Sequence, residues 1–263
     1  MNNDTAELIV SAVRGAAGVR RTADGISPSR LPDWTREQFD SPMMQWVTDQ
    51  TSGVRLAFRT SATWLEIDLT TTRMLYPNMP PHLCPARIAL TLDGVPAGVA
   101  EAADGPYRLL AGTADATDVA GARTTARFDL GVPPTTSPRR VEIWLPNNAS
   151  VQIHDVRSDA AVQADRSEAG TRWLHYGSSI SHCAEADTPL GVWPVDAAHR
   201  LGLDITNLGF GGNAHLDPFV ARTIRDSDAE LISVKLGINI VNADSFKRRT
   251  FIPAHIPTII RIP

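Results

Sequence analysis

The residues best suited to chemistry in this sequence lie in three short segments, each of which follows a predicted strand. The first is Gly177-Ser178-Ser179-Ile180-Ser181, the second covers residues 207–213, and the third covers residues 236–239. Because the carboxyl ends of parallel strands meet at one edge of a sheet, the three segments are expected to line a single crevice. A serine there can act as a nucleophile, and glycine amides and an asparagine side chain can stabilise the oxyanion that forms. The pattern therefore indicates acyl transfer by a serine.

The three segments resemble the sequence blocks of the GDSL hydrolases, which are also called the SGNH family. Residues 177–180 are similar to the first block, although Ser178 replaces the aspartate of the family name. Residues 207–213 (Asn-Leu-Gly-Phe-Gly-Gly-Asn) are similar to the second block. Residues 237–239 are similar to the third, where Ile240 replaces the aspartate that commonly follows.

The resemblance implies roles for three residues. Ser179 would be the nucleophile, its own amide and that of Gly212 would form the oxyanion hole, and Asn239 would be the third donor. The implied activity is that of a serine esterase without metal or cofactor, which removes small acyl groups such as acetate. Family members with a β-sandwich ahead of the hydrolase domain are known, and they often act on acyl groups carried by carbohydrate. The expected partner is therefore a small-molecule or carbohydrate ester.

The general base is not assigned by the sequence. In the GDSL family it is the histidine of an Asp-x-x-His block near the carboxyl terminus, and no such block follows the third segment. Residues 196–199 do spell Asp-Ala-Ala-His, but they lie in a predicted helix, where residues at i and i+3 form a surface pair. His255 has Ile252, not an acidic residue, three positions before it. His199 and His255 are thus weak candidates for the base.

Two further histidines, His175 and His182, flank the nucleophile segment, and we expect them to serve packing rather than catalysis. Beyond the third segment, residues 251–263 contain three prolines, which predicts no long helix there. Because a hydrolase domain of this class has further strands after the third, we expect the chain to be a shortened or altered version of a longer enzyme.

Alternation of apolar and polar residues dominates residues 51–157. Leu65, Ile67 and Leu69 alternate with Glu66 and Asp68, and other runs repeat the pattern. Period two with turn-rich breaks predicts an antiparallel β-sandwich of jelly-roll type. Around residues 158–170 the alternation ends, and small and polar residues predominate, which indicates a linker. The predicted units are a lead-in at 1–30, the sandwich at 31–160, a linker at 161–171 and an α/β domain at 172–263.

The α/β domain is predicted from strands that alternate with helices. Strands are expected at 173–176, 204–208 and 231–236. Helices are expected at 190–201 and over a run of helical spacing that reaches residue 224, with Asp217 as N-cap and Pro218 at the first helical position. This order indicates the first half of a flavodoxin-like SGNH domain, incomplete at its carboxyl end.

Composition is that of a soluble globular protein, with 43% hydrophobic and 21% charged residues. A net charge of −4 gives no reason to expect nucleic acid or an anionic membrane as a partner. Residues 1–19 lack the pattern of a signal peptide and no stretch approaches a membrane span, so a cytoplasmic location is expected.

Cys84 and Cys183 have no metal-type spacing, and a disulfide between them is left open. The oligomeric state is not assigned.

Other interpretations stay open. Residues 209–214 also fit the Gly-x-Gly-x-x-Ala dinucleotide fingerprint, with Asp228 downstream, which would indicate an oxidoreductase. That motif normally follows the first strand of its domain, and here it follows the second. A non-catalytic carbohydrate-binding or interaction protein derived from a hydrolase is a further alternative. Four tryptophans could form a sugar-stacking face or pack in the core: Trp34, Trp46, Trp64 and Trp144.

Overall fold

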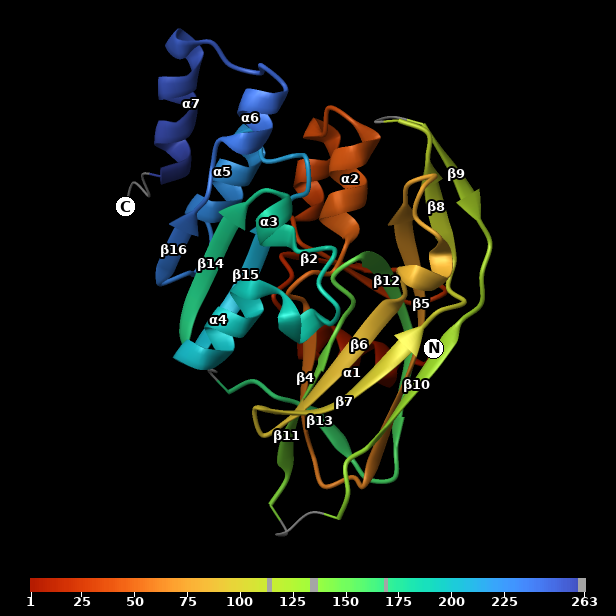
Figure 1. Ribbon diagram of the computed structural model, residues 1–263. Coiled ribbons are helices and arrows are strands. Elements are labelled where there is room, and N and C mark those ends of the chain that lie inside the picture. Colours follow the sequence, from red (N-terminus) through yellow and green to blue (C-terminus); the bar gives the residue numbers. More distant parts are fainter. Residues whose placement is uncertain (113–114, 133–136, 168–169, 260–263) are drawn as a thin grey trace.

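The structure is a computed structural model that describes residues 1–112, 115–132, 137–167 and 170–259; the side chains of residues 255–259 lie outside this description. In these ranges the chain forms two lobes, one built from two mainly antiparallel sheets and the other from a parallel sheet with helices (Figure 1). The predicted change from antiparallel to parallel architecture along the chain is confirmed. Connections of jelly-roll type remain a prediction.

The N-terminal lobe contains two sheets. The first has the strand order β1-β4-β11-β6-β7, with β13 also paired to β4. Its strands are β1 (Val13–Arg14), β4 (Arg55–Thr60), β6 (Ala86–Leu92), β7 (Val95–Ala102), β11 (Arg139–Trp144) and β13 (Val162–Ala164). The second has the order β2-β3-β12-β5-β8-β9, with β10 also paired to β5. Its strands are β2 (Gly18–Arg21), β3 (Ile26–Ser29), β5 (Trp64–Leu75), β8 (Tyr107–Leu110), β9 (Ala116–Val119), β10 (Thr124–Asp129) and β12 (Ala149–Ser158).

The core of this lobe lies between its two sheets. Along β5, buried residues alternate with half-buried ones, so one face of the strand turns inward, as period two requires. Leu65, Ile67 and Leu69 of β5 share one buried cluster with Leu56 of β4 and Ile143 of β11. The predicted alternation is therefore confirmed for this strand.

The first fifty residues pack against both lobes, which differs from a simple lead-in. Helix α1 (Asn3–Ala12) buries Ile9 in the core of the N-terminal lobe, and β1 to β3 pair within its sheets. Helix α2 (Pro42–Asp49) lies between the lobes in Figure 1 and contributes Met44 and Val47 to the core of the α/β lobe. Residues 162–164, expected in the linker, pair with β4. Strands this short carry too few residues to show a period, so the sequence pattern did not reveal them.

The α/β lobe has the parallel strand order β15-β14-β16. Its strands are β14 (Thr171–Gly177), β15 (Leu203–Gly209) and β16 (Leu231–Val234). Its helices are α3 (Ser179–His182), α4 (Trp193–Leu201), α5 (Pro218–Arg225), α6 (Ile238–Asn242) and α7 (Arg248–Ile259). Short 3-10 helices lie at η1 (Asp33–Gln38), η2 (Pro81–Leu83) and η3 (Pro189–Gly191). The three predicted strands and both predicted helices are present, and Asp217 and Pro218 begin α5 as expected.

Alternate residues of β14 face two different cores. Trp173 packs with Val195 and Ala198 of α4, whereas Leu174 and Tyr176 pack on the other side in the cluster that contains α5. The parallel sheet is thus covered on both faces, which is typical of such sheets.

The prediction of no long helix near the carboxyl terminus was wrong, because α7 spans Arg248–Ile259 with Pro253 in its interior. Proline there removes a backbone hydrogen bond. Phe251 and Ala254 nevertheless pack against the buried cluster of α5, and such tertiary contacts override a weak propensity.

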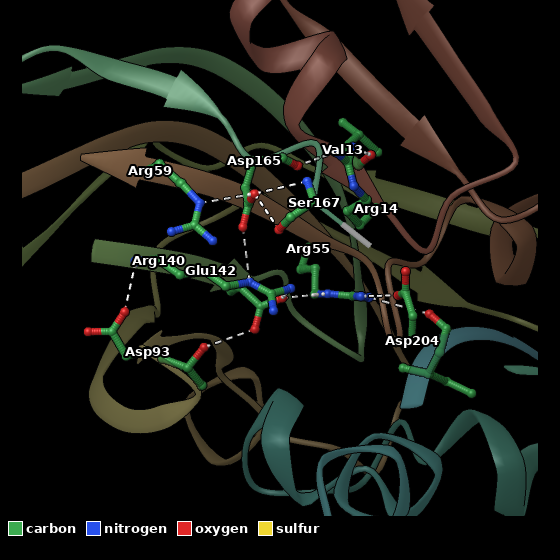
Figure 2. Close-up of polar contacts among 12 residues, drawn as sticks. Val13, Arg14, Arg55, Arg59, Asp93, Arg140, Glu142, Asp165, Ser167 and Asp204 are labelled. Atoms are coloured by element: carbon green, nitrogen blue, oxygen red, sulfur yellow. Dashed lines mark hydrogen bonds and ion pairs between the residues drawn. The ribbon is translucent and has the colours of Figure 1, made fainter. Parts of the chain in front are cut away.

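Ion pairs of Arg55 connect the two lobes. Its Nε donates to Glu142 Oε1 of β11 at 3.0 Å, and its Nη2 donates to the Asp204 carboxylate of β15. Figure 2 shows the guanidinium between these two carboxylates. Arg140 extends the network from Glu142 to Asp165. Because the Arg55 side chain is only 3% exposed, this contact is buried between the lobes.

Cys84 and Cys183 are both free thiols, so no disulfide joins them. No helix within the described ranges is long and apolar enough to cross a membrane.

Candidate active site

Ser179 begins α3 at the carboxyl edge of the central strand. β14 ends at Gly177, and Ser178 is the N-cap residue of α3. Ser179 is exposed, and its Oγ has no hydrogen-bond partner among the residues the structure describes. Its backbone N–H is also unpaired, because the first amides of a helix have no partner within it. The serine is therefore open to a substrate.

The loop that follows β15 lies against Ser179. A Cβ on Gly209 would come within 2.3 Å of the His182 backbone nitrogen, so only glycine allows α3 to approach the strand this closely. A Cβ on Gly211 would lie 3.9 Å from the Cβ of Ser179. Gly212 has φ +73°, a conformation that residues with a side chain rarely adopt. The structure thus brings the second predicted segment beside the first.

Asn239 of α6 binds this same loop. Its Oδ1 accepts a hydrogen bond from the Ala214 backbone N–H at 3.1 Å. This bond fixes the plane of the side-chain amide, and Nδ2 has no partner in the described part of the chain. One end of the amide therefore holds the loop while the other remains a donor.

The three donors that the family resemblance implies share one property, which is that none is paired within the described ranges. They are the N–H of Ser179, the N–H of Gly212 and Nδ2 of Asn239. The backbone N–H of Gly211, the residue just before Gly212, is instead paired, because it donates to His182 Nδ1 at 3.3 Å. Unpaired donors of this kind are suited to stabilise an oxyanion.

His182 is fully engaged on both ring nitrogens. Its Nε2 donates to the Asn147 carbonyl at 3.1 Å, and its Nδ1 accepts from Gly211. Burial, followed by the charge of Arg30, holds the pKa of His182 well below its usual value. The ring is a neutral structural group, in agreement with the expected packing role.

His175 lies on β14 behind the nucleophile. Its ring nitrogens contact Ser181 Oγ and Ser233 Oγ, each at 2.7 Å. Burial, followed by the charge of Lys235, lowers its pKa to about 4. Both ring nitrogens of His175 are therefore taken up by the hydroxyls of Ser181 and Ser233, and the ring contacts α3 through Ser181.

The two candidates for the base give different outcomes. His199 is exposed on α4, and Asp196 pairs with Arg200 at 2.9 Å instead of orienting the histidine, because residues at i and i+4 lie on one helix face. Asp196 thus forms its surface pair with Arg200 and not, as the i,i+3 spacing had suggested, with His199. His255 lies in α7, but its side chain is outside the described residues.

The dinucleotide interpretation finds no support in the loop geometry. In that motif the glycines open directly into a helix, whereas α5 begins at Pro218, beyond Ala214. Asp228 is bound to Arg172 at 3.5 Å rather than placed to bind a ribose. Among the described residues, no group of three or more His, Cys, Asp or Glu could hold a metal ion.

Each of the four tryptophans has an arginine over its ring. Trp144 is buried and pairs with Arg55. The other pairs are Trp34–Arg222, Trp46–Arg108 and Trp64–Arg127. Each ring is already covered on one face, which disfavours a common stacking face for sugar.

The sequence did not single out the residues of the N-terminal lobe that hold the nucleophile segment. Ser52 Oγ donates to the His182 carbonyl at 2.6 Å, and Asn147 Nδ2 donates to the Cys183 carbonyl at 2.7 Å. Arg30 donates to the Gly209 carbonyl. Ser52 and Arg30 are 130 and 179 residues from these partners, so no local pattern marks them.

His215 was also missed. It donates from Nε2 to the Gly212 carbonyl at 3.1 Å, and its Nδ1 contacts Ser245 Oγ at 3.0 Å. His215 lies two residues after the second segment, and this closeness in sequence was its only sign of a place in the site.

Solved structures with a similar fold include a salicylyl-acyltransferase from a tetracycline biosynthetic pathway, with 28% sequence identity and a TM-score of 0.78. The alignment covers 94% of this chain and 64% of the acyltransferase, so this chain spans less than two thirds of that protein. A GDSL-like lipase from Bacteroides ovatus has 16% identity and a TM-score of 0.64, over 94% of this chain and 68% of the lipase. A family two carbohydrate esterase from Cellvibrio japonicus has 11% identity and a TM-score of 0.56, over 96% and 72% of the two chains. These last two similarities concern the fold alone.

A search of curated proteins found no match. A comparison with family models matches residues 172–252, the part that contains all three segments, to the GDSL-like lipase/acylhydrolase family. The similarity to the GDSL-like lipase/acylhydrolase family thus extends over residues 172–252, the part of the chain that carries the candidate site.

Proposed function

We propose that the chain is a serine esterase that hydrolyses small acyl esters, such as acetyl esters, through an acyl-enzyme on Ser179. The observation that carries the proposal is the exposed Ser179 beside three unpaired donors, two of them backbone amides and one Asn239 Nδ2. Backbone and amide donors of this kind stabilise the oxyanion of acyl transfer.

In the proposed reaction, Ser179 Oγ attacks the acyl carbonyl carbon and gives its proton to a base. The carbonyl oxygen becomes an oxyanion that the N–H groups of Ser179 and Gly212 and Nδ2 of Asn239 stabilise. Collapse breaks the bond to the alcohol, which leaves with a proton, and water then releases the acid from Ser179. The base stays unassigned, because no imidazole among the described side chains is hydrogen-bonded to Ser179 Oγ.

The alcohol part of the substrate is proposed to be a carbohydrate. The support is the similarity in fold to the family two carbohydrate esterase, which shares the sheets ahead of the hydrolase lobe. The polar network that ties these sheets to the nucleophile segment is consistent with one site built by both lobes.

The test is hydrolysis of 4-nitrophenyl acetate by the chain and by Ser179→Ala, with Ser61→Ala on the turn between β4 and β5 as the matched control. We expect turnover in the chain and in the control and none in Ser179→Ala, with an acetylated mass on Ser179 in the intact protein. Turnover that survives in Ser179→Ala would exclude Ser179 as nucleophile. No turnover in any of the three proteins, with glycan binding retained in Ser179→Ala, would favour the non-catalytic carbohydrate-binding alternative.

A second candidate is acyl transfer to an alcohol, favoured by the 28% identity to the salicylyl-acyltransferase over 94% of this chain. Both activities share the acyl-enzyme and differ in what attacks it. Adding methanol to the assay and measuring methyl acetate against acetate distinguishes them, because a transferase gives mainly the ester.

A further inference from the structure

His182 connects the N-terminal lobe to the loop beside the nucleophile. The side chain is buried, and its Nε2 contacts the Asn147 carbonyl at 3.1 Å. Because a carbonyl oxygen can only accept, Nε2 must carry the proton and Nδ1 must present a lone pair. That lone pair accepts the Gly211 N–H at 3.3 Å. The carbonyl of one lobe therefore fixes the tautomer that binds the loop of the other.

Asn147 lies on the connection between β11 and β12 and also binds through its side chain. Its Nδ2 donates to the carbonyls of Cys183 and Ala186 at 2.7 and 3.1 Å, with the Ala184 carbonyl at 3.3 Å. The two N–H groups of the Asn147 side chain are shared among these three carbonyls, so residues 183–186, which follow α3, are held by one amide group. The end of the nucleophile helix is thus attached to the N-terminal lobe.

A second route leads from Ser52 to the same helix. Ser52 Oγ donates to the His182 carbonyl at 2.6 Å and accepts from Asn207 Nδ2 at 3.1 Å. Asn207 also donates to the Ser181 carbonyl and accepts from the Gly209 N–H. The backbone of His182 and the start of the glycine loop are therefore held independently of the imidazole, which leaves the imidazole to set Gly211.

The position of Gly211 decides where the next amide points. A Cβ on Gly211 would lie 3.4 Å from His182 Nδ1 and 3.9 Å from the Ser179 Cβ, so the residue is placed between them. Its N–H is taken up by the imidazole, and the following N–H, that of Gly212, is unpaired in the described ranges.

We infer that His182 is a positioning residue of the esterase site: in the tautomer fixed by the Asn147 carbonyl, it holds the Gly211 amide so that the Gly212 amide is directed at the oxyanion. The inference rests on the proposed function. It also goes beyond it, because it makes the N-terminal lobe part of the catalytic unit. A charged imidazole would carry a proton on Nδ1 and lose the Gly211 bond, and the burial of the ring opposes that charge.

The test uses two substitutions that each retain one half of the imidazole. In His182→Asn, the side-chain oxygen can occupy the place of Nδ1 and accept from Gly211. In His182→Gln, the side-chain nitrogen can occupy the place of Nε2 and donate to Asn147, but no acceptor remains for Gly211. We expect kcat to stay within about threefold in His182→Asn and to fall about 100-fold in His182→Gln, with KM little changed in both, because a misplaced group near the reacting atoms costs about that factor. Equal kcat values in the two variants would overturn the inference.

The matched control is His154→Gln in β12. His154 is also buried and also bonded on both nitrogens, to Thr70 Oγ1 at 2.8 Å and the Asp24 carbonyl at 2.6 Å, but within the N-terminal lobe. We expect it to lower stability without lowering kcat. A similar loss of kcat in this control would assign the effect to a buried imidazole in general and count against His182.

A second readout does not depend on turnover, so it separates failure of this inference from failure of the proposed function. In Ser179→Ala labelled with ¹⁵N, the imidazole signals of His182 should show a protonated Nε2 and an unprotonated Nδ1 from pH 5 to 8. The Gly211 amide should exchange with solvent at least tenfold faster after His182→Gln. A His182 ring that titrates in this range, or unchanged exchange at Gly211, would refute the positioning role even if the chain hydrolyses no ester.

Discussion

Asn239 shows how one side chain can serve the scaffold and the reaction at once. Its Oδ1 accepts from the Ala214 N–H and thereby orients an amide whose Nδ2 is unpaired among the described residues. Asparagine suits this position because it carries an acceptor and two donors on one rigid plane.

This division of labour predicts that Asn239→Asp will separate activity from stability. The carboxylate can still accept from Ala214, but it cannot donate to an oxyanion and it places negative charge beside it. Loss of one oxyanion donor costs about 100- to 1,000-fold in kcat. We expect a fall in this range with a nearly unchanged melting temperature, measured by esterase kinetics and thermal unfolding. Asn242→Asp, exposed on the same helix, should leave kcat unchanged; comparable kcat losses in the two variants would contradict the role of Asn239.

At the residue scale, short segments at strand ends made Ser179, Gly212 and Asn239 candidates through a family resemblance, and their roles remain a prediction. The sequence could not locate His182 as the group that holds Gly211, or Asn147 as its partner. Those roles depend on contacts between separate segments, and nothing in the neighbouring sequence specifies them. The same limit applies to the base, which no local pattern identified.

Among the elements, α5 begins at a residue with an unusual environment. Asp217 is its N-cap residue, yet its side chain makes no capping hydrogen bond. Burial, followed by the nearby charge of Asp40, raises the pKa of Asp217 to about 6, although His215 opposes the shift. The folded protein therefore favours the protonated carboxyl more than the unfolded chain does.

This shift predicts a pH-dependent cost at the start of α5. A raised acidic pKa lowers stability as pH rises from about 4, the ordinary value, through about 6. Asp217→Asn removes the titration, so we expect it to raise the free energy of unfolding by about 2 kcal/mol at pH 7.5 and to change it little at pH 4. Urea unfolding at both pH values is the measurement. Asp226→Asn, exposed at the other end of α5, should show no such gain, and an equal effect of Asp217→Asn at pH 4 and 7.5 would refute the explanation.

Elements with a clear local sequence pattern were predicted, and those without one were not. The strands that became β14, β15 and β16 were expected because each is a short apolar run that ends in glycine or polar residues. Helix α7 was missed because Pro253 argues against a helix locally, whereas the packing of Phe251 and Ala254 that favours it is tertiary. The strands β1 and β13 have two and three residues, too few for any pattern.

For the whole molecule, the lobes are joined by side chains with paired charges. Arg55 lies between Glu142 of its own lobe and Asp204 of the other (Figure 2). Glu142 also pairs with Arg140, and the exposed fraction of the Glu142 side chain is 7%. Removing one partner of a buried pair leaves an uncompensated charge, which is more costly than the pair itself.

We therefore expect Arg55→Met to lower the free energy of unfolding by about 3 to 5 kcal/mol, measured by urea unfolding at pH 7. The control is Arg200→Met, which breaks the exposed pair with Asp196 on α4 and should cost about 0.5 kcal/mol or less. A similar small loss in both variants would show that the Arg55 network adds little to the contact between the lobes.

At this scale the sequence predicted two kinds of architecture but not how the chain moves between them. The predicted boundary after residue 30 separates β3 from α2, and α2 in fact packs into the core of the α/β lobe. Because early residues contribute to both cores, no single boundary along the chain describes the lobes.

The hydrogen bond between His182 and the Asn147 carbonyl bears on how such a protein can change through recombination. If the two lobes were modules, either could be exchanged for that of a distant homologue. Here an exchange would retain the serine and lose the carbonyl that fixes the imidazole beside it. We expect the connection between β11 and β12 to be inherited together with the nucleophile segment, and a descendant with a foreign N-terminal lobe to have an intact nucleophile and a misdirected amide.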